Sequence, residues 1–104
     1  MERLEGGADG ARFARRLEEA LCSLDTPEEA HAFLADLCSR REIVGLAQRL
    51  EVASMLREGA SYVDVSRATG ASSTTVSRVS KCLNGDTGGY RLVLERLEER
   101  DASL

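Results

Sequence analysis

The stretch from residue 61 to residue 84 reads S-Y-V-D-V-S-R-A-T-G-A-S-S-T-T-V-S-R-V-S-K-C-L-N, and it decides the fold. It predicts two short helices joined by a tight turn. Gly70 lies where the first helix has to end, because glycine enters the left-handed backbone region at little steric cost. Ser61 and Ser72 each precede a helix, where a serine hydroxyl can accept a hydrogen bond from a free backbone N–H of the next turn.

The apolar positions of this stretch fit a helix-turn-helix, in which small apolar side chains hold the two helices together. These positions are Val65, Ala71, Val76 and Val79. The second helix otherwise carries hydroxyls, two cations and no acid. That surface suits the base edges and phosphates of a DNA major groove. Serine and threonine are mediocre helix formers, so a helix kept only for stability would use other residues. We therefore interpret residues 61–84 as a DNA-reading helix-turn-helix.

The candidate DNA-binding residues follow from this interpretation. Hydroxyl groups would face base edges or bridging water, and the cations would contact phosphates or purine edges. On the second helix and its start, the candidates are Ser72, Ser73, Thr74, Thr75, Ser77, Arg78 and Lys81. On the first helix, Ser66 and Arg67 could touch the DNA backbone. A plain helical hairpin with solvated hydroxyls would share the apolar pattern, and this alternative stays open.

Length and composition favour one small helical domain. The chain has 104 residues and is 42% hydrophobic but only 4% aromatic, so any core is aliphatic. We predict a domain over 11–100, with a disordered tail at 1–10 and a C-terminal tail at 101–104. No apolar run approaches the length of a membrane helix. The first ten residues lack the pattern of a signal peptide, so we expect a cytoplasmic protein.

The net charge of −4 is unevenly distributed. Residues 1–38 carry nine acids and four arginines, a net charge of −5. Residues 39–85 carry seven bases and four acids, a net charge of +3, and residues 86–104 carry a net charge of −2. The positive block coincides with the helix-turn-helix. This local charge, more than the total, sets the field that a phosphate backbone meets.

The reactive side chains do not form a catalytic or metal-binding pattern. Cys22, Cys38 and Cys82 are far apart, and no C-x-x-C or Cys/His cluster occurs. His31 is the only histidine and has no partner motif. We expect neither an enzyme nor a cofactor nor a metal site, because catalysis usually needs a convergent set of titratable groups.

Four further helices are predicted from apolar residues that recur at intervals of three and four. A Thr-Pro-x-Glu start and a Ser-x-x-Glu start precede two of them. The helices span about 11–24, 27–38, 40–58 and 90–100, and the stripe of the third is Ile43, Leu46, Ala47, Leu50, Ala53 and Leu56. The sequence thus predicts an all-α fold of six helices. The stripes of the first two must bury against something, and a second copy of the chain is the simplest partner.

From Leu37 to Leu97 the sequence resembles the tryptophan repressor superfamily, in particular its YerC/YecD group. The segments that carry the resemblance are GLAQRLEVA at 45–53, LREG at 56–59, ASSTTVSRV at 71–79, KCLN at 81–84 and GYRLVLERL at 89–97. The resemblance implies an all-helical, intertwined homodimer that binds double-stranded operator DNA and regulates transcription as a repressor. In such a dimer, two reading helices would enter successive major grooves.

The resemblance also implies an effector pocket. In the repressor, tryptophan lies between two arginines, whose positions are matched here by Arg49 and Arg78. Two neighbouring positions differ, because Val79 replaces a glycine and Cys82 replaces a serine that contacts the ligand's amino group. Val79 would occupy space that the indole ring needs. Surface ion pairs or phosphate contacts are the simpler interpretation of the two arginines.

The competing function is a helical interaction and dimerisation module, in which the helix-turn-helix docks on protein. The salt dependence of binding distinguishes the two functions, because DNA affinity falls steeply with ionic strength through counterion release. Binding to an apolar docking surface would be nearly indifferent to salt.

We predict that free tryptophan is not the effector, because of Val79 and Cys82. Calorimetry with millimolar tryptophan is expected to show no saturable heat, and tryptophan should leave DNA binding unchanged. A saturable heat, or tighter DNA binding with tryptophan present, would contradict the prediction.

Overall fold

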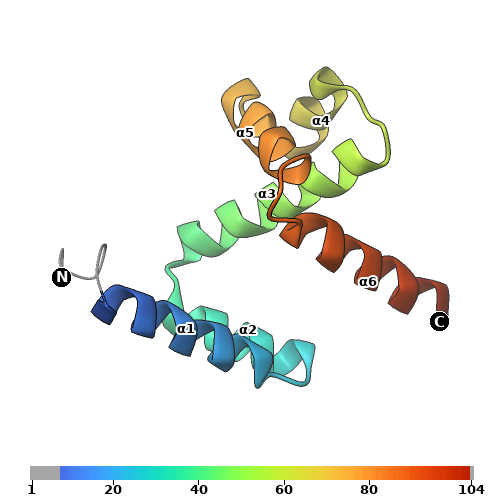
Figure 1. The fold of residues 1–104 in the computed structure, drawn as a ribbon. Coiled ribbons are helices and arrows are strands. Elements are labelled where there is room, and N and C mark those ends of the chain that lie inside the picture. Colours follow the sequence, from blue (N-terminus) through green and yellow to red (C-terminus); the bar gives the residue numbers. More distant parts are fainter. Residues whose placement is uncertain (1–7, 104) are drawn as a thin grey trace. The chain divides into compact units, whose positions relative to one another are not determined.

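The computed structural model describes residues 8–103, and all of its regular elements are α-helices. Their order along the chain follows the predicted order (Figure 1). The helices are α1 (Ala8–Cys22), α2 (Pro27–Leu37), α3 (Arg40–Arg57), α4 (Tyr62–Thr69), α5 (Ser73–Leu83) and α6 (Gly89–Ser103). The prediction of an all-α fold with six helices is therefore confirmed for the described residues. α1 begins at Ala8, inside the predicted tail, and the rest of that tail lies outside the described residues.

Contacts along the chain separate two compact units, one up to Arg40 and one from Arg41 onward. The first unit contains α1 and α2, joined by residues 23–26. Thr26 caps α2 by accepting a hydrogen bond from the Glu29 backbone N–H (3.1 Å), as the sequence predicts. The Glu29 carboxylate accepts from the Asp25 backbone N–H (2.8 Å), one residue before the usual partner in a capping box.

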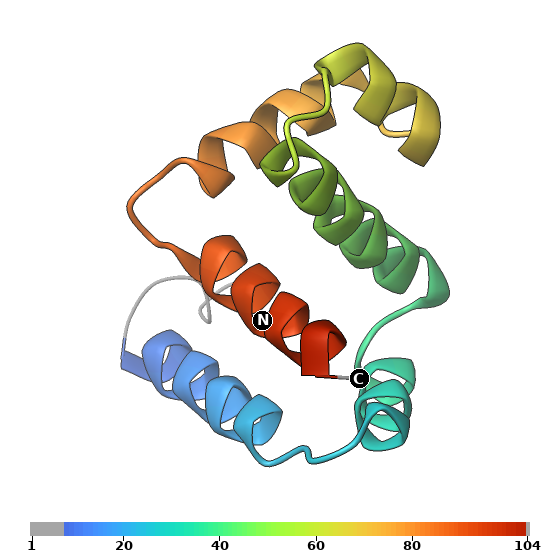
Figure 2. The same cartoon turned by 90° about the vertical axis from the view of Figure 1, so that its right-hand side faces the viewer.

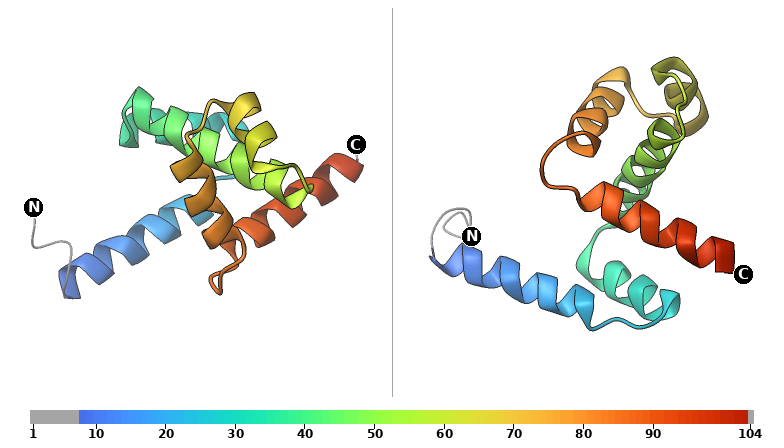
Figure 3. Two further views of the ribbon diagram at one scale, coloured as in Figure 1. Left: turned by 90° about the horizontal axis from the view of Figure 1, so that it is seen from above. Right: turned by 45° about the vertical axis from the view of Figure 1, so that its right-hand side comes forward.

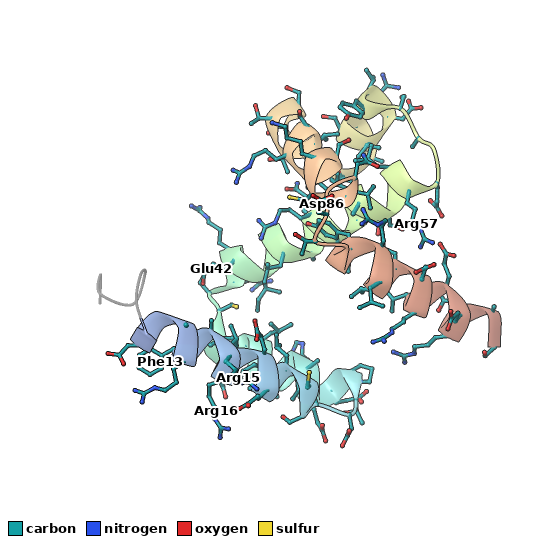
Figure 4. The ribbon with its side chains drawn as sticks, in the orientation of Figure 1. Phe13, Arg15, Arg16, Glu42, Arg57 and Asp86 are labelled. Atoms are coloured by element: carbon teal, nitrogen blue, oxygen red, sulfur yellow. The ribbon has the colours of Figure 1, made fainter. Side chains whose placement is uncertain are left out.

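The first unit has no buried core of its own. No residue of α1 or α2 whose exposure is described is buried. Its apolar stripe is partly open to solvent, and the exposed members are Phe13, Leu17, Leu21 and Leu37. On the polar side of α1, Arg16 pairs with Glu19 at 3.1 Å, and Figure 4 shows Phe13, Arg15 and Arg16 along this helix. Such exposed ion pairs add little stability. The stability of the α1–α2 hairpin therefore depends on further burial of its apolar side chains.

The second unit is built around the helix-turn-helix. α4 and α5 lie over the C-terminal half of α3, and α6 starts beside the end of α5 (Figures 1 and 3). The view in Figure 2 shows α5 and α6 joined by the loop at 84–88. One aliphatic core joins these four helices, and its members are Val52, Ala53, Val65, Ala71, Val76, Val79, Leu83 and Leu94.

The turn between α4 and α5 has the predicted geometry. Gly70 has φ of +76°, in the left-handed region, and its N–H donates to the Ser66 carbonyl oxygen at 2.9 Å. Ser61 caps α4 by accepting from the Asp64 backbone N–H at 3.1 Å. Ser72 caps α5 in the same way, accepting from the Thr75 backbone N–H at 3.1 Å. The predicted caps and the four predicted apolar positions of the motif are confirmed.

The predicted apolar stripe of α3 needs a correction. Val52, which the stripe omits, is fully buried, whereas Leu46, which the stripe includes, is 43% exposed. The reason is that α4, α5 and α6 cover only the C-terminal half of α3, on the side of Val52 and Ala53. The N-terminal half of α3 has no covering helix within its own unit.

None of the described helices is both long enough and apolar enough to cross a membrane.

Gly70→Ala is expected to destabilise the fold by about 1 kcal/mol, because a Cβ at φ of +76° is strained. Space is not the cause, since the nearest atom to that Cβ, Nε2 of Gln48, would be 3.9 Å away. Gly89→Ala is the matched control. It adds the same methyl group at the start of α6, with nothing within 4 Å and without a positive φ. Helix propensity there favours alanine over glycine.

Urea denaturation of both variants at one protein concentration measures the difference. Unfolding midpoints that shift equally and in the same direction would contradict the assigned role of Gly70.

Candidate nucleic-acid interface

Helix α5, which the sequence predicts to be the reading helix, has two distinct faces. Val76, Val79 and Leu83 are buried on the inner face. The outer face carries Thr74, Ser77, Arg78 and Lys81, which are all exposed. Ser77 and Arg78 are adjacent, and each lies three or four residues from Thr74 and from Lys81, so the four form one continuous stripe along the helix. We call these four residues the outer stripe.

The outer stripe is free to bind. Among the described residues, no hydrogen bond or ion pair engages the side chains of its four members. The same holds for Ser73 at the first turn of α5 and for Arg67 on α4, which are both exposed. α5 contains no acidic residue. The surface therefore offers three cations and three hydroxyls without an internal carboxylate that would compete for them.

Three other predicted contact residues form hydrogen bonds within the turn and at the start of α5. Ser66 is half-buried and donates its hydroxyl to the Ala71 carbonyl oxygen at 2.5 Å. The Ser72 hydroxyl accepts from the Thr75 backbone N–H and lies 3.1 Å from the Thr75 hydroxyl. These hydroxyls fix the start of α5, so their part in binding DNA stays a prediction.

Further hydrogen bonds tie the C-terminal part of α5 to its neighbours. The Tyr62 hydroxyl donates to the Ser80 hydroxyl at 2.6 Å, which links α4 to α5. Arg91 of α6 donates to the Leu83 carbonyl oxygen at the end of α5. Arg57 of α3 pairs with Glu98 of α6 at 2.9 Å, and Figure 4 shows Arg57 at the end of α3. α5 is thus held directly by Tyr62 of α4 and by Arg91 of α6. Gln48 of α3 acts on it only through α4, because its amide donates to the Thr69 carbonyl oxygen.

A cavity of about 420 Å³ lies at the inner side of α5, next to α3 and the start of α6. It brings together the four residues predicted as an effector pocket, Arg49, Arg78, Val79 and Cys82. Gln48, Thr75 and Tyr90 complete the lining. This volume falls in the range of small-molecule sites.

Val79 lines this cavity without closing it. Its side chain is only 2% exposed, because most of it packs into the core. The exclusion of tryptophan by Val79 therefore stays a prediction. The predicted pocket did not include Gln48, Thr75 or Tyr90. Gln48 directly precedes Arg49 on α3, whereas Tyr90 comes from α6 and reaches the two arginines only through packing.

The described residues contain no group of His, Cys, Asp or Glu side chains that could hold a metal ion. His31 lies exposed on α2. The three cysteines are unpaired, and Cys38 is the only one of them that is half-buried.

Comparison with known proteins agrees with this architecture. Residues 14–98 match the family model of the Trp repressor protein. The chain is 46% identical over 86 residues to the uncharacterized protein YerC of Bacillus subtilis (strain 168), with 83% of each chain covered.

Solved structures with the same fold include a TrpR-like protein from Eubacterium eligens. It is 41% identical, superposes with a TM-score of 0.80, and the match covers 94% of this chain and 96% of that one. A structure from Staphylococcus aureus is 35% identical with a TM-score of 0.80, and the match covers 93% and 92% of the two chains. With a family model that spans most of the sequence and a relative of this identity, the chain belongs to the Trp repressor protein family.

Proposed function

We propose that this protein is a sequence-specific, DNA-binding repressor of transcription that acts as a homodimer in the cytoplasm. The observation that carries the proposal is the outer stripe of α5. A stripe of hydroxyls and cations, with no acid on its helix and no partner within the described chain, lies on the second helix of a helix-turn-helix. In that motif the second helix enters the major groove.

The cations and the hydroxyls of this surface would have different roles in DNA recognition. Arg67, Arg78 and Lys81 would neutralise phosphates and so fix the position of the protein on the duplex. Ser73, Thr74 and Ser77 would read base edges directly or through water. Short hydroxyl side chains suit this role, because they allow the backbone of α5 to come close to the bases.

The apolar surface supports the dimer. α1 and α2 expose the stripe that begins with Phe13 and Leu17, and no described residue of their unit is buried. On the other unit, Leu46, Leu92 and Val93 are also more than 40% exposed. Large exposed apolar areas of this kind mark interaction surfaces. A second copy offers the same stripes for mutual burial.

A protein-docking role is the second candidate, and one observation favours it. Tyr62 and Val63 at the start of α4 are 50% and 65% exposed, beside the shallow hollow that Arg67 and Ser73 line. A protein surface could cover this patch. The dependence of binding on salt distinguishes this function from DNA binding.

We expect a dimer in light scattering, and we expect Leu17→Glu to lower its mass towards that of one chain of 11.3 kDa. A carboxylate in the middle of the exposed stripe of α1 would have to be desolvated on association. Glu18→Gln, on the same helix, should leave the mass unchanged. A monomeric wild-type protein would contradict the dimer.

Selection of bound fragments from random duplex DNA at two salt concentrations tests the proposal as a whole. A palindromic sequence with half-sites about one helical turn apart is expected at both concentrations. If no sequence is enriched, or if binding vanishes uniformly with salt, specific DNA recognition by this protein is contradicted.

Two variants then separate phosphate contacts from base contacts on the selected fragment. Lys81→Gln should weaken binding to all sequences and lower the slope of log affinity against log salt by roughly two units, one for each copy in the dimer. Thr74→Ala should cost about 1–3 kcal/mol at one base pair of each half-site and leave the slope unchanged. Arg100→Gln, which removes one charge near the end of α6, is the control for Lys81→Gln. Equal slopes for the two charge variants would show that Lys81 does not contact DNA.

A further inference from the structure

The helix-turn-helix and α3 share an apolar core, whose contacts include no directional bond. The helix-turn-helix meets α3 through Val52 and Ala53, which join the same core as Val65 and Val76. These side chains are small and aliphatic, and the hydrophobic effect that buries them has no directional preference. A hydrogen bond between α3 and the turn would add a directional constraint on the angle at which α4 and α5 lie on α3.

Gln48 supplies such an interaction. Its side-chain Nε2 donates to the carbonyl oxygen of Thr69 at 3.1 Å, in a half-buried position. Thr69 is the last residue of α4, and carbonyls of the last helical turn have no partner within their own helix. The bond therefore satisfies an otherwise open acceptor and attaches the start of the turn to α3, across 21 positions of sequence.

The other hydrogen bonds of the turn are local. The Thr69 hydroxyl donates to the Val65 carbonyl oxygen at 2.7 Å and accepts from the Ala71 backbone N–H at 3.2 Å. Ser66 donates to the Ala71 carbonyl oxygen at 2.5 Å. These bonds set the shape of the turn, but they join residues of the helix-turn-helix to one another. They do not determine how the turn is placed on α3.

We propose that Gln48 is a positioning residue that sets the angle at which α5 presents its first turn to DNA. This inference rests on the proposed function. α5 begins four residues after Thr69 and has 11 residues, so it is about 16 Å long. A rotation of about 5° at the turn would displace one end of the helix relative to the other by roughly 1.4 Å over that length. Such a displacement is enough to break a hydrogen bond to a base edge.

The braces at the far end of α5 localise the effect. Arg91 and Tyr62 hold the C-terminal part of the helix at Leu83 and Ser80, independently of Gln48. Loss of the Gln48 bond should therefore disturb the N-terminal end of α5, where Ser73 and Thr74 lie. Contacts near Lys81 should change little.

Gln48→Met tests the assignment, because methionine keeps the length and helix propensity of glutamine and removes the donor. Gln48→Lys retains a donor of similar reach and should rescue. Ser103→Ala is the control, since it also removes a side-chain to backbone hydrogen bond, the one from Ser103 to the Glu99 carbonyl oxygen (2.9 Å) at the end of α6. The ratio of affinities for the selected fragment and for random duplex cancels the uniform effect of the added lysine charge.

Two measurements decide the outcome. Amide hydrogen exchange at Gly70 and Ala71 should be faster in Gln48→Met and normal in Gln48→Lys and Ser103→Ala. The affinity ratio of Gln48→Met should fall about three- to tenfold, in proportion to one lost hydrogen bond. The loss should concentrate at the base pairs whose recognition Thr74→Ala also weakens.

Unchanged exchange in Gln48→Met would overturn the proposal, because the amide would not hold the turn. Faster exchange with an unchanged affinity ratio would also overturn it, since Gln48 would then be only a local brace. A wild-type protein that does not distinguish the selected fragment from random duplex would refute the proposed function instead. The exchange data would separate that result from a failure of the Gln48 assignment.

Discussion

The backbone at position 70 turns with φ of +76°, and the arrangement of the second unit depends on this one conformation. This left-handed conformation of Gly70 lets α4 end and α5 begin within a few residues. Val65 of α4 and Val76 of α5 can therefore meet in one core over α3. Once those side chains are inside, helical geometry leaves the opposite side of α5 outside. The exposed surface of hydroxyls and cations is thus a consequence of how the turn buries its apolar residues.

Burial is distributed very unevenly between the two units. The whole buried core belongs to α3–α6 and consists of valine, leucine and alanine, whereas α1 and α2 contribute no buried residue among those described. A small aliphatic core of this kind supports limited stability on its own. In the proposed dimer, the uncovered apolar stripes would make folding and assembly interdependent, because stability would then rise with the concentration of the chain. The charge pattern is consistent with this division, since the segment 1–38 carries the net −5 and the segment 39–85, which includes the reading helix, carries the net +3.

Local features of the fold could be predicted from the sequence, because they depend on residues that are neighbours along the chain. The caps at Ser61 and Ser72 and the end of α4 at Gly70 are of this kind. Features that depend on distant partners could not be predicted. The periodicity of α3 is compatible with more than one face, and only the position of α4 and α5 selects Val52 over Leu46. The separation of exposed hydroxyls from those that brace the turn, and the bond from Gln48 to Thr69, likewise require three-dimensional packing.

Arg78 belongs to two surfaces at once, the outer stripe and the cavity beside α3. A molecule bound in the cavity could therefore engage the same guanidinium that would contact DNA, and it would also meet the Gln48 amide that holds the turn. Substitution of Arg78 cannot distinguish loss of a DNA contact from loss of such a molecule. Arg49 lines the cavity from α3 and is not part of the outer stripe. It is therefore the position at which occupancy of the cavity can be probed while the reading surface is kept intact.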